Sequence, residues 1–245
     1  MKIAVLFDGA GLARLGLEQA GHTCTGFEID PLKHRLSRFV GSGNCILGDA
    51  TAANLLEYDA VWASPPCQER SNARTQGTLN RTCYLDWCLQ IDKPILWVEN
   101  IVQFSLAESL AGRGQFYNAA QFLEKPIQNR RRIVEGRFKA PYTYRGFKYY
   151  ENDLCPAITA TEYKGCATDN RRASRYYGRK LTLEECAFHQ GFEIPVPWWP
   201  VPPGMRRRYW EENLYEAIGN GVPVYMARAF GAVYDARSCT NVTER

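Results

Sequence analysis

The 245-residue sequence lacks any apolar run close to the about 20 residues needed to cross a bilayer. It has no Cys-x-x-Cys pair among its nine cysteines, which excludes the common zinc and dithiol redox motifs. The cysteines are odd in number and scattered, so reduced thiols in a cytoplasmic protein are favoured over a disulfide framework. Internal repeats and low-complexity segments are missing too. With 45% hydrophobic and 23% charged residues, the composition is that of a soluble globular protein.

Short apolar segments alternate with helix-like segments in the first hundred residues. We predict buried strands at Lys2–Phe7, Thr23–Ile29, Asn44–Leu47, Ala60–Ala63 and Pro94–Val98. Helical spacing occurs between them at Ala13–Ala20 and Pro31–Phe39, and an apolar, helix-compatible pattern returns at Leu214–Phe230. This order predicts an α/β fold with a parallel sheet, in which ligands bind at the carboxyl ends of the strands.

Residues suited to binding a nucleoside follow three of these strands. The glycine turn Phe7–Gly11 leaves room for a cofactor beside a helix start. Glu28, about twenty residues later, can accept hydrogen bonds from both ribose hydroxyls. Asp49 follows the third strand and could reach an adenine amino group. A pocket of this kind without phosphate-binding glycines favours S-adenosylmethionine over a dinucleotide.

Two further strand ends carry reactive groups. In Ser64–Gln68, two prolines fix the backbone and present the thiol of Cys67 at the edge of the sheet. The nearby Arg70 and Arg74 favour a thiolate, which is the nucleophilic form. Glu99 ends an apolar strand, where partial burial would let its carboxyl group hold or share a proton. The other eight cysteines are interpreted as small core residues.

Positive charge gathers in one part of the chain. Residues 127–180 carry a net charge of +8, whereas the whole chain carries +4. This part is dense in arginine and tyrosine, and arginine suits phosphates and base edges. It is therefore a candidate nucleic-acid-binding face, and a solvated loop without a partner is the alternative.

Together these motifs resemble those of the cytosine-C5 DNA methyltransferases, in order and along nearly the whole chain. Besides the residues above, the resemblance rests on Glu99-Asn100, Gln128–Arg132, Arg179–Glu185, Gln190–Phe192 and Gly219–Pro223. The sequence departs from the family pattern at Leu12, where another glycine is usual, and at Phe188-His189. We interpret His189 as a packed or capping residue.

The resemblance implies an enzyme with an S-adenosylmethionine-dependent methyltransferase fold, a Rossmann-like sheet flanked by helices. It would transfer a methyl group to carbon 5 of a cytosine flipped out of DNA, through a covalent Cys67 adduct and without a metal. Glu99 and Arg132 would contact the base, Arg130 would support the pocket, and Asn220 would brace the Pro66-Cys67 turn. The implied cofactor-binding residues are Phe7, Gly9, Gly11, Glu28, Ile29, Asp49, Pro66, Asn220 and Val222. The implied DNA-contacting residues are Gln68, Arg70, Arg74, Arg81, Arg145, Arg171 and Arg172.

The predicted domain organisation follows from the same resemblance. Residues 1–138 and 179–245 would form the catalytic domain, and residues 139–178 a reduced, irregular recognition insert. Only 46 residues separate Arg132 from Arg179, so few side chains are available to read base edges. We therefore expect a short or relaxed recognition sequence. The segment Glu69–Thr82 is expected to close over the flipped base.

The expected partner is double-stranded DNA, bound by a monomer in the cytoplasm of a bacterium or expressed from a phage, with no membrane association. Roles in restriction-modification, phage DNA modification and epigenetic marking are indistinguishable from the sequence. Three alternatives remain open. One branch of the resembled family acts on tRNA, so the substrate could be RNA. The chain could also be a non-catalytic nucleic-acid-binding subunit, or it could transfer a group other than methyl.

Overall fold

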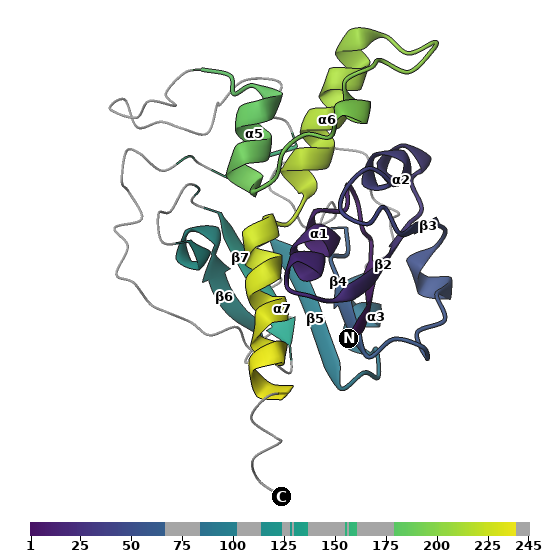
Figure 1. Cartoon of the computed structure of the whole chain (residues 1–245), viewed down its shortest axis with the longest axis vertical. Coiled ribbons are helices and arrows are strands. Elements are labelled where there is room, and N and C mark those ends of the chain that lie inside the picture. Colours follow the sequence, from purple (N-terminus) through teal and green to yellow (C-terminus); the bar gives the residue numbers. More distant parts are fainter. Residues whose placement is uncertain are drawn as a thin grey trace, which may run out of the picture.

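A computed structural model describes residues 1–66, 84–101, 114–123, 128, 130–136, 155, 157–160 and 179–238. The strands are β1 (Lys2–Leu6), β2 (Thr23–Glu28), β3 (Cys45–Leu47), β4 (Ala60–Ala63), β5 (Ile95–Ile101), β6 (Gly114–Asn118) and β7 (Arg131–Gly136). The helices are α1 (Leu12–Gln19), α2 (Pro31–Ser37), α3 (Tyr84–Leu89), α5 (Leu183–Gln190), α6 (Arg207–Asn220) and α7 (Val224–Ser238). Short 3₁₀ turns are η1 (Ala50–Ala52), η2 (Ala119–Phe122) and η4 (Val196–Trp198). Figure 1 shows their arrangement.

The described strands form one sheet in the order β3-β2-β1-β4-β5-β7-β6. The first five run parallel, which confirms the predicted α/β class and all five predicted strands to within a few residues. β7 is antiparallel to both β5 and β6. The strand order reverses direction between β1 and β4, which is where open α/β sheets form a binding crevice.

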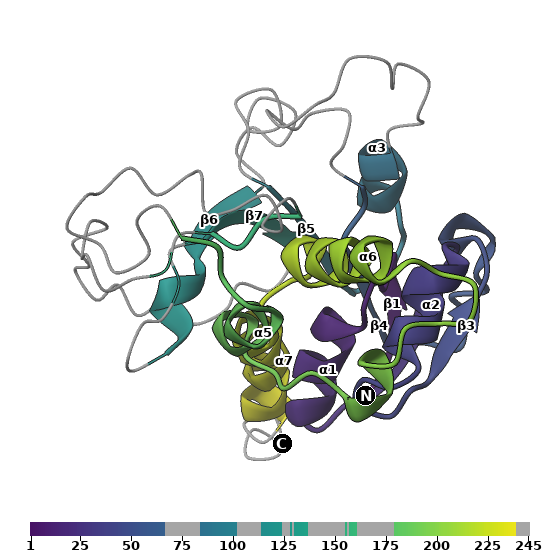
Figure 2. The same ribbon diagram turned by 90° about the horizontal axis from the view of Figure 1, so that it is seen from above.

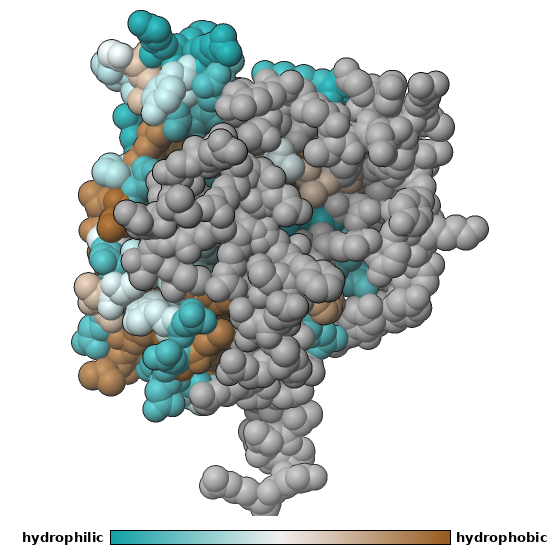
Figure 3. All heavy atoms as spheres, turned by 180° about the vertical axis from the view of Figure 1, so that it is seen from behind, coloured by the Kyte–Doolittle hydropathy of each residue, from teal (hydrophilic) through white to brown (hydrophobic). Residues whose placement is uncertain are grey.

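The central parallel strands β1, β4 and β5 are buried on both faces, as continuous apolar strands require. Ile3 and Val5 face one side together with α1 and α7, whereas Ala4 and Leu6 face the other side together with α3. Figure 2 shows these two layers on opposite sides of the sheet. At the outer edge, β3 leaves Ile46 and Leu47 exposed, and Figure 3 shows apolar patches on this side of the molecule.

A third core cluster packs residues 10–40 against residues 155–224. Trp198 in η4 is fully buried and its indole Nε1 donates a hydrogen bond to the Leu36 carbonyl of α2 at 3.0 Å. α5 and α6 pack in the same cluster, and so do Cys155 and Ile158. The C-terminal part of the chain is thereby fixed beside the carboxyl ends of the first strands.

The segment Leu214–Phe230, which the sequence presents as one helix-compatible pattern, is two helices. α6 ends at Asn220 and α7 begins at Val224. Pro223 disfavours helical backbone at the residue before it and has no N–H to donate. The resulting turn directs residues 220–222 towards the carboxyl ends of the strands.

The antiparallel β6–β7 hairpin was not predicted either.

The motif Arg179–Glu185 is a helix start. The Thr182 hydroxyl accepts a hydrogen bond from the Glu185 amide, and the Glu185 carboxylate accepts one from the Thr182 amide, which is a capping box. Arg179 donates two hydrogen bonds to the same carboxylate and lowers the pKa of Glu185. These residues start α5, in which His189 is buried as expected of a packed residue.

Five of the nine cysteines lie within the described residues, and all five are buried, as interpreted from the sequence. Burial raises the pKa of Cys24 and of Cys45 to about 12. Because an unfolded thiol ionises near pH 9, the unfolded state releases protons between pH 9 and 12 that the folded state keeps. Both thiols therefore contribute stability below pH 9 that is lost as the pH rises.

As the pH rises above 9, we expect the free energy of unfolding to fall less steeply in Cys24→Ala than in wild type. Each raised thiol changes the unfolding equilibrium constant by up to about tenfold per pH unit in this window. Urea titrations at pH 8, 9, 10 and 11 measure the slope. Equal slopes for wild type and Cys24→Ala would contradict the prediction.

Two absences apply to the described part of the chain alone. None of its helices is long and apolar enough to cross a membrane. No three His, Cys, Asp or Glu side chains within it are grouped so that they could hold a metal ion.

Candidate active site

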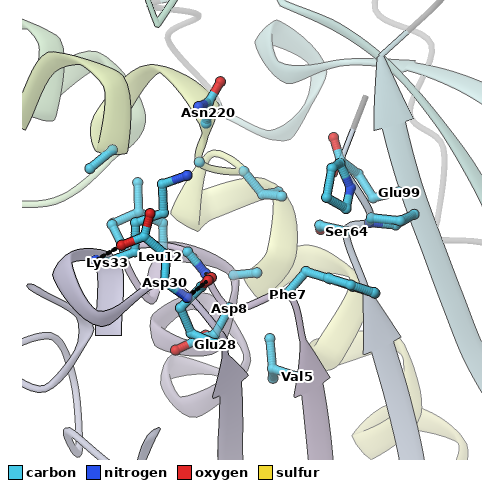
Figure 4. A pocket seen from close by; sticks show the side chains of 18 of the residues that line it. Val5, Phe7, Asp8, Leu12, Glu28, Asp30, Lys33, Ser64, Glu99 and Asn220 are labelled. Atoms are coloured by element: carbon cyan, nitrogen blue, oxygen red, sulfur yellow. Dashed lines mark hydrogen bonds between the residues drawn. The ribbon is translucent and has the colours of Figure 1, made fainter. Parts of the chain in front are cut away.

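A cavity of about 290 Å³ opens at the carboxyl ends of β1, β2, β4 and β5, where the strand order reverses. Its walls come from the turns after these strands, from the start of α1 and from the end of α6. Figure 4 shows Glu28 and Asp30 on one side of it and Glu99 on the other, with Phe7 between them and Asn220 at the end of α6. The cavity is therefore one continuous space with a carboxylate at each end.

The glycine turn after β1 forms the floor of the cavity. Phe7 has a φ of 59°, which is rare for a residue with a side chain, and its ring lies 5.4 Å from that of Tyr84. Gly9 also has a positive φ, of 58°. A Cβ atom added at Gly9 would meet no neighbour closer than 4.0 Å, because the space in front of it is the cavity. A ligand can therefore approach this backbone closely.

Glu28 is held in place by two backbone amides. Its Oε2 accepts a hydrogen bond from the Gly9 amide at 2.8 Å, and its Oε1 accepts one from the Asp30 amide at 2.8 Å. Each carboxylate oxygen keeps a further lone pair for a ligand hydroxyl. Ile29 follows with 64% of its surface exposed and lines the cavity. This end thus presents a fixed acceptor beside an apolar side chain.

A buried ion pair supports the glycine turn from below. The Arg14 Nε atom lies 3.0 Å from Asp8 Oδ2, and both side chains are fully buried. Arg14 also donates to the carbonyl oxygens of Ser37 and Val40. Gly11 does not line the cavity, and its predicted contact with the cofactor stays a prediction. A Cβ atom there would lie 2.7 Å from the Arg14 guanidinium, so Gly11 provides space for arginine and starts α1 with a φ of 85°.

Glu99 and Arg132 form the opposite end. The Arg132 Nε atom lies 2.7 Å from Glu99 Oε1, and both side chains are mostly buried yet line the cavity. Arg132 pairs with Ile101 across the antiparallel β5–β7 ladder. Ile101 and Glu99 are two residues apart in β5 and therefore lie on the same face of the sheet. The pairing of β5 with β7 thus places the Arg132 side chain beside the Glu99 carboxylate. Arg132 was predicted as a base contact, whereas its bond to Glu99 was not.

Asn100 holds the turn that precedes Cys67. Its side-chain Nδ2 donates a hydrogen bond to the Pro65 carbonyl at 3.2 Å, and its Oδ1 accepts one from the Ile101 amide. Ser64, Pro65 and Pro66 line the cavity. Asn220 lines the cavity from α6, and its predicted bracing of the Pro66-Cys67 turn stays a prediction, because Cys67 lies outside the described residues.

Arg130 lies behind the cavity wall. It is buried, and its guanidinium donates to the carbonyl oxygens of Ile158, Gly219 and Gly221. Gln190 donates to the Gly221 carbonyl as well, at 3.0 Å. Arg130 does not line the cavity, and the role predicted for it in the site stays a prediction. It fixes the turn that presents Asn220 and Val222.

The structure brings most of the predicted site residues that it describes into the cavity lining. These are Phe7, Gly9, Glu28, Ile29, Pro66, Glu99, Arg132, Asn220 and Val222. Asp49 is not among them. Its carboxylate accepts hydrogen bonds from the Thr51 amide and hydroxyl and so starts η1, because Asp and Thr two residues apart satisfy each other locally.

Several predictions fall outside the described residues. They concern the nucleophile Cys67 and the DNA contacts Gln68, Arg70, Arg74, Arg81, Arg145, Arg171 and Arg172. Of residues 139–178, the structure describes 155 and 157–160. Cys155 and Ile158 belong to the core cluster with α5 and α6.

Sequence reasoning missed Arg14 and Lys33, and it named Gln190 and Asn100 as motif residues without giving them a role in the site. Lys33 lines the cavity from α2. The sequence contains a weak indication of the buried Arg14–Asp8 pair. An arginine on the apolar face of a helix is costly unless a carboxylate such as Asp8 is near. Leu12, noted as a departure from the family pattern, lines the cavity and packs against Gly221, where a Cβ atom would come within 2.5 Å of its Cδ1.

The sequence matches no model of a known protein family and no curated protein. The structure is similar to the Dnmt2 methyltransferase of S. pombe, with 12% identity and a TM-score of 0.63 over 97% of this chain and 99% of that chain. The methyltransferase EhMeth of Entamoeba histolytica matches with 13% identity and a TM-score of 0.63 over 96% and 98%. A candidate DNA modification methyltransferase encoded within an E. coli prophage matches with 14% identity and a TM-score of 0.58 over 97% and 99%. The chain thus has the Rossmann-like fold of the S-adenosylmethionine-dependent methyltransferases.

Proposed function

We propose that the protein transfers a methyl group from S-adenosylmethionine to carbon 5 of cytosine in DNA, through a covalent adduct of Cys67. One observation carries the proposal: a single cavity has a carboxylate held by two backbone amides at one end and an acid–guanidinium pair at the other. The turn that leads into Cys67 forms part of the wall between them. A methyl donor and a base bound at the two ends would face each other.

The cofactor end fits the nucleoside part of S-adenosylmethionine. Glu28 offers two oxygens that backbone amides already orient, as recognition of a ribose diol requires. Ile29 offers an apolar surface for an adenine ring, and Gly9 leaves the space in front of it open. Bound S-adenosylmethionine supplies an electrophilic methyl group. The protein's residues have to hold that group against the base and activate carbon 5.

Activation of carbon 5 is the task of the other end. The Cys67 thiolate adds to carbon 6 of cytosine, which forms a C–S bond and moves an electron pair towards carbon 5 and ring nitrogen 3. Glu99 in its protonated form donates a hydrogen bond or proton to nitrogen 3 and so stabilises this charge. Arg132 orients the Glu99 carboxyl group and contacts the base oxygen. Once carbon 5 has taken the methyl group and S-adenosylhomocysteine is the leaving group, a water molecule accepts the carbon 5 proton. The electron pair of that C–H bond expels the thiolate and restores the aromatic ring, and the nitrogen 3 proton returns to Glu99.

Duplex DNA is the proposed substrate because the segment 127–180 carries a net charge of +8. Such charge gives affinity for phosphates that is largely independent of sequence. A base in a duplex has both ring faces covered, so the target cytosine has to leave the stack. The recognition sequence would be short or relaxed.

The experiment that tests the proposal is covalent trapping. Fluorine at carbon 5 prevents the final elimination, so we expect wild-type protein with S-adenosylmethionine and a 5-fluorocytosine duplex to form an adduct that survives denaturation. Cys67→Ser should form none, and Cys24→Ala, with its buried thiol, serves as the matched control that still does. Adducts are measured by denaturing gel and mass spectrometry.

Duplexes of varied sequence distinguish the possible outcomes. Adducts on many different duplexes would support a relaxed recognition sequence. Adducts on 5-fluorocytosine RNA and on no duplex would replace DNA by RNA as the substrate. No adduct on either polymer, with cofactor binding intact, would overturn the proposed reaction.

A further inference from the structure

Lys33 is a cation in the wall of the cofactor end of the cavity. The charged residues of the lining are the acids Asp8, Glu28, Asp30 and Glu99 and the bases Lys33 and Arg132. Arg132 is bound to Glu99 at the far end, and Asp8 is bound to Arg14. At the cofactor end, Lys33 is therefore the described lining residue that can attract an anion.

The partner of Lys33 is weakly bound and can be exchanged. Lys33 Nζ lies 3.5 Å from Glu216 Oε1, and their side chains are 26% and 42% exposed. Exposed ion pairs of this kind contribute little stability. The pair joins α2 to α6 one turn before Asn220, at the end of the helix that lines the cavity. Lys33 lines the cavity and Glu216 does not, so the pair holds the lysine at the edge of the cavity.

The start of α1 supplies a second source of positive potential at the same wall. The helix begins after Gly11 without a side-chain cap and without an acidic residue in its first turn. Its first residues Leu12 and Ala13 line the cavity. The first amides of a helix lack intrahelical acceptors and favour an anion.

We propose that Lys33 binds the α-carboxylate of S-adenosylmethionine and exchanges Glu216 for it when the cofactor enters. The inference rests on the proposed function, because it names how the same cavity holds its cofactor. The carboxylate is the anionic group of that molecule, and the wall between Lys33 and α1 suits it. Glu216 is then a competitor that occupies the lysine in the empty cavity.

The competitor role separates this proposal from a purely structural one. If the ion pair only ties α2 to α6, removing either partner weakens cofactor binding by the same mechanism. If Lys33 binds the carboxylate, removing Lys33 weakens binding and removing Glu216 strengthens it. Lys33→Gln and Glu216→Gln form a matched pair of nearly isosteric changes at partly exposed sites.

Isothermal titration calorimetry without nucleic acid measures the effect for S-adenosylmethionine and for decarboxylated S-adenosylmethionine, which differ in the carboxylate. For S-adenosylmethionine, we expect Lys33→Gln to raise the Kd about 5- to 10-fold and Glu216→Gln to lower it about 2-fold, as a charged hydrogen bond and a weak surface pair suggest. For the decarboxylated ligand, the Kd of wild type and Lys33→Gln should agree within about 2-fold, since an exposed ion pair is weak.

Any other outcome would count against either the role of Lys33 or the proposed function. Equal loss of affinity for both ligands in Lys33→Gln, or weaker binding in Glu216→Gln, would overturn the role of Lys33. Equal affinity of wild type for the two ligands would also overturn it. Failure of wild type to bind either ligand would instead count against the proposed function.

Discussion

Replacing Glu99 by Gln is expected to lower kcat for methyl transfer by about 100- to 1,000-fold, the usual effect of removing a group that transfers or shares a proton in the transition state. The amide can still accept the bond from Arg132 Nε, so the geometry at 2.7 Å is largely kept. The amide cannot donate a proton to ring nitrogen 3. Single-turnover methyl transfer to duplex DNA measures the change.

The Kd for S-adenosylmethionine distinguishes a slower chemical step in Glu99→Gln from a misfolded protein. Glu99 and Glu28 lie at opposite ends of the cavity (Figure 4), so the Kd for S-adenosylmethionine should stay within about twofold, a difference too small to reflect a lost charged hydrogen bond. Glu57→Gln, at an exposed position, is the matched control and should leave the rate unchanged. A Glu99→Gln rate within tenfold of wild type would contradict the role of Glu99 as the proton-bearing group.

Replacing Arg130 by Met is expected to lower the free energy of unfolding by about 3–5 kcal/mol, because the carbonyls of Ile158, Gly219 and Gly221 lose their buried donor. For a chain of this length the Tm would fall by about 10 °C. Binding of S-adenosylmethionine should weaken too, since those carbonyls fix the turn that carries Asn220 and Val222. Thermal and urea denaturation measure the loss.

Arg208→Met is the matched control for this prediction. Arg208 is exposed in the first turn of α6 and pairs with Glu212 at 3.0 Å. Exposed pairs of this type contribute about 0–1 kcal/mol, so its Tm should remain near that of wild type. An equal Tm for the two variants would contradict the prediction that the hydrogen bonds from Arg130 to residues 158, 219 and 221 stabilise the fold.

The parallel half of the fold could be predicted because its signals are local. Each strand from β1 to β5 is a short apolar run, and the residues after them, such as Gly9, Glu28 and Glu99, meet at one edge of the sheet as parallel topology requires. The β6–β7 hairpin could not be predicted, because in Gly114–Asn118 the strand formers Phe116 and Tyr117 are flanked by Gly, Gln and Asn, and the strand is stabilised by pairing with β7.

The supporting contacts of the site were less predictable than the site itself. Asp49 was predicted to contact an adenine, whereas the bonds of its Oδ1 to the Thr51 amide and hydroxyl were not predicted. Arg130 and Gln190 are far apart in the sequence and share an acceptor at Gly221. Such long-range hydrogen bonds depend on where the turn after α6 comes to lie, which no local pattern in the sequence encodes.

The position of α6 and α7 also makes the cavity depend on two parts of the chain that are far apart in the sequence. The floor of the cavity comes from residues 5–13, whereas its opposite wall comes from residues 217–222. α7 lies against α1, where Gly16 leaves room for the backbone of Val224. A nascent chain that has completed all five parallel strands therefore carries Glu28 and Glu99 in an open groove. We therefore expect the groove to become a cavity once α6 and α7 pack against α1, so an unfinished chain would bind the proposed methyl donor weakly.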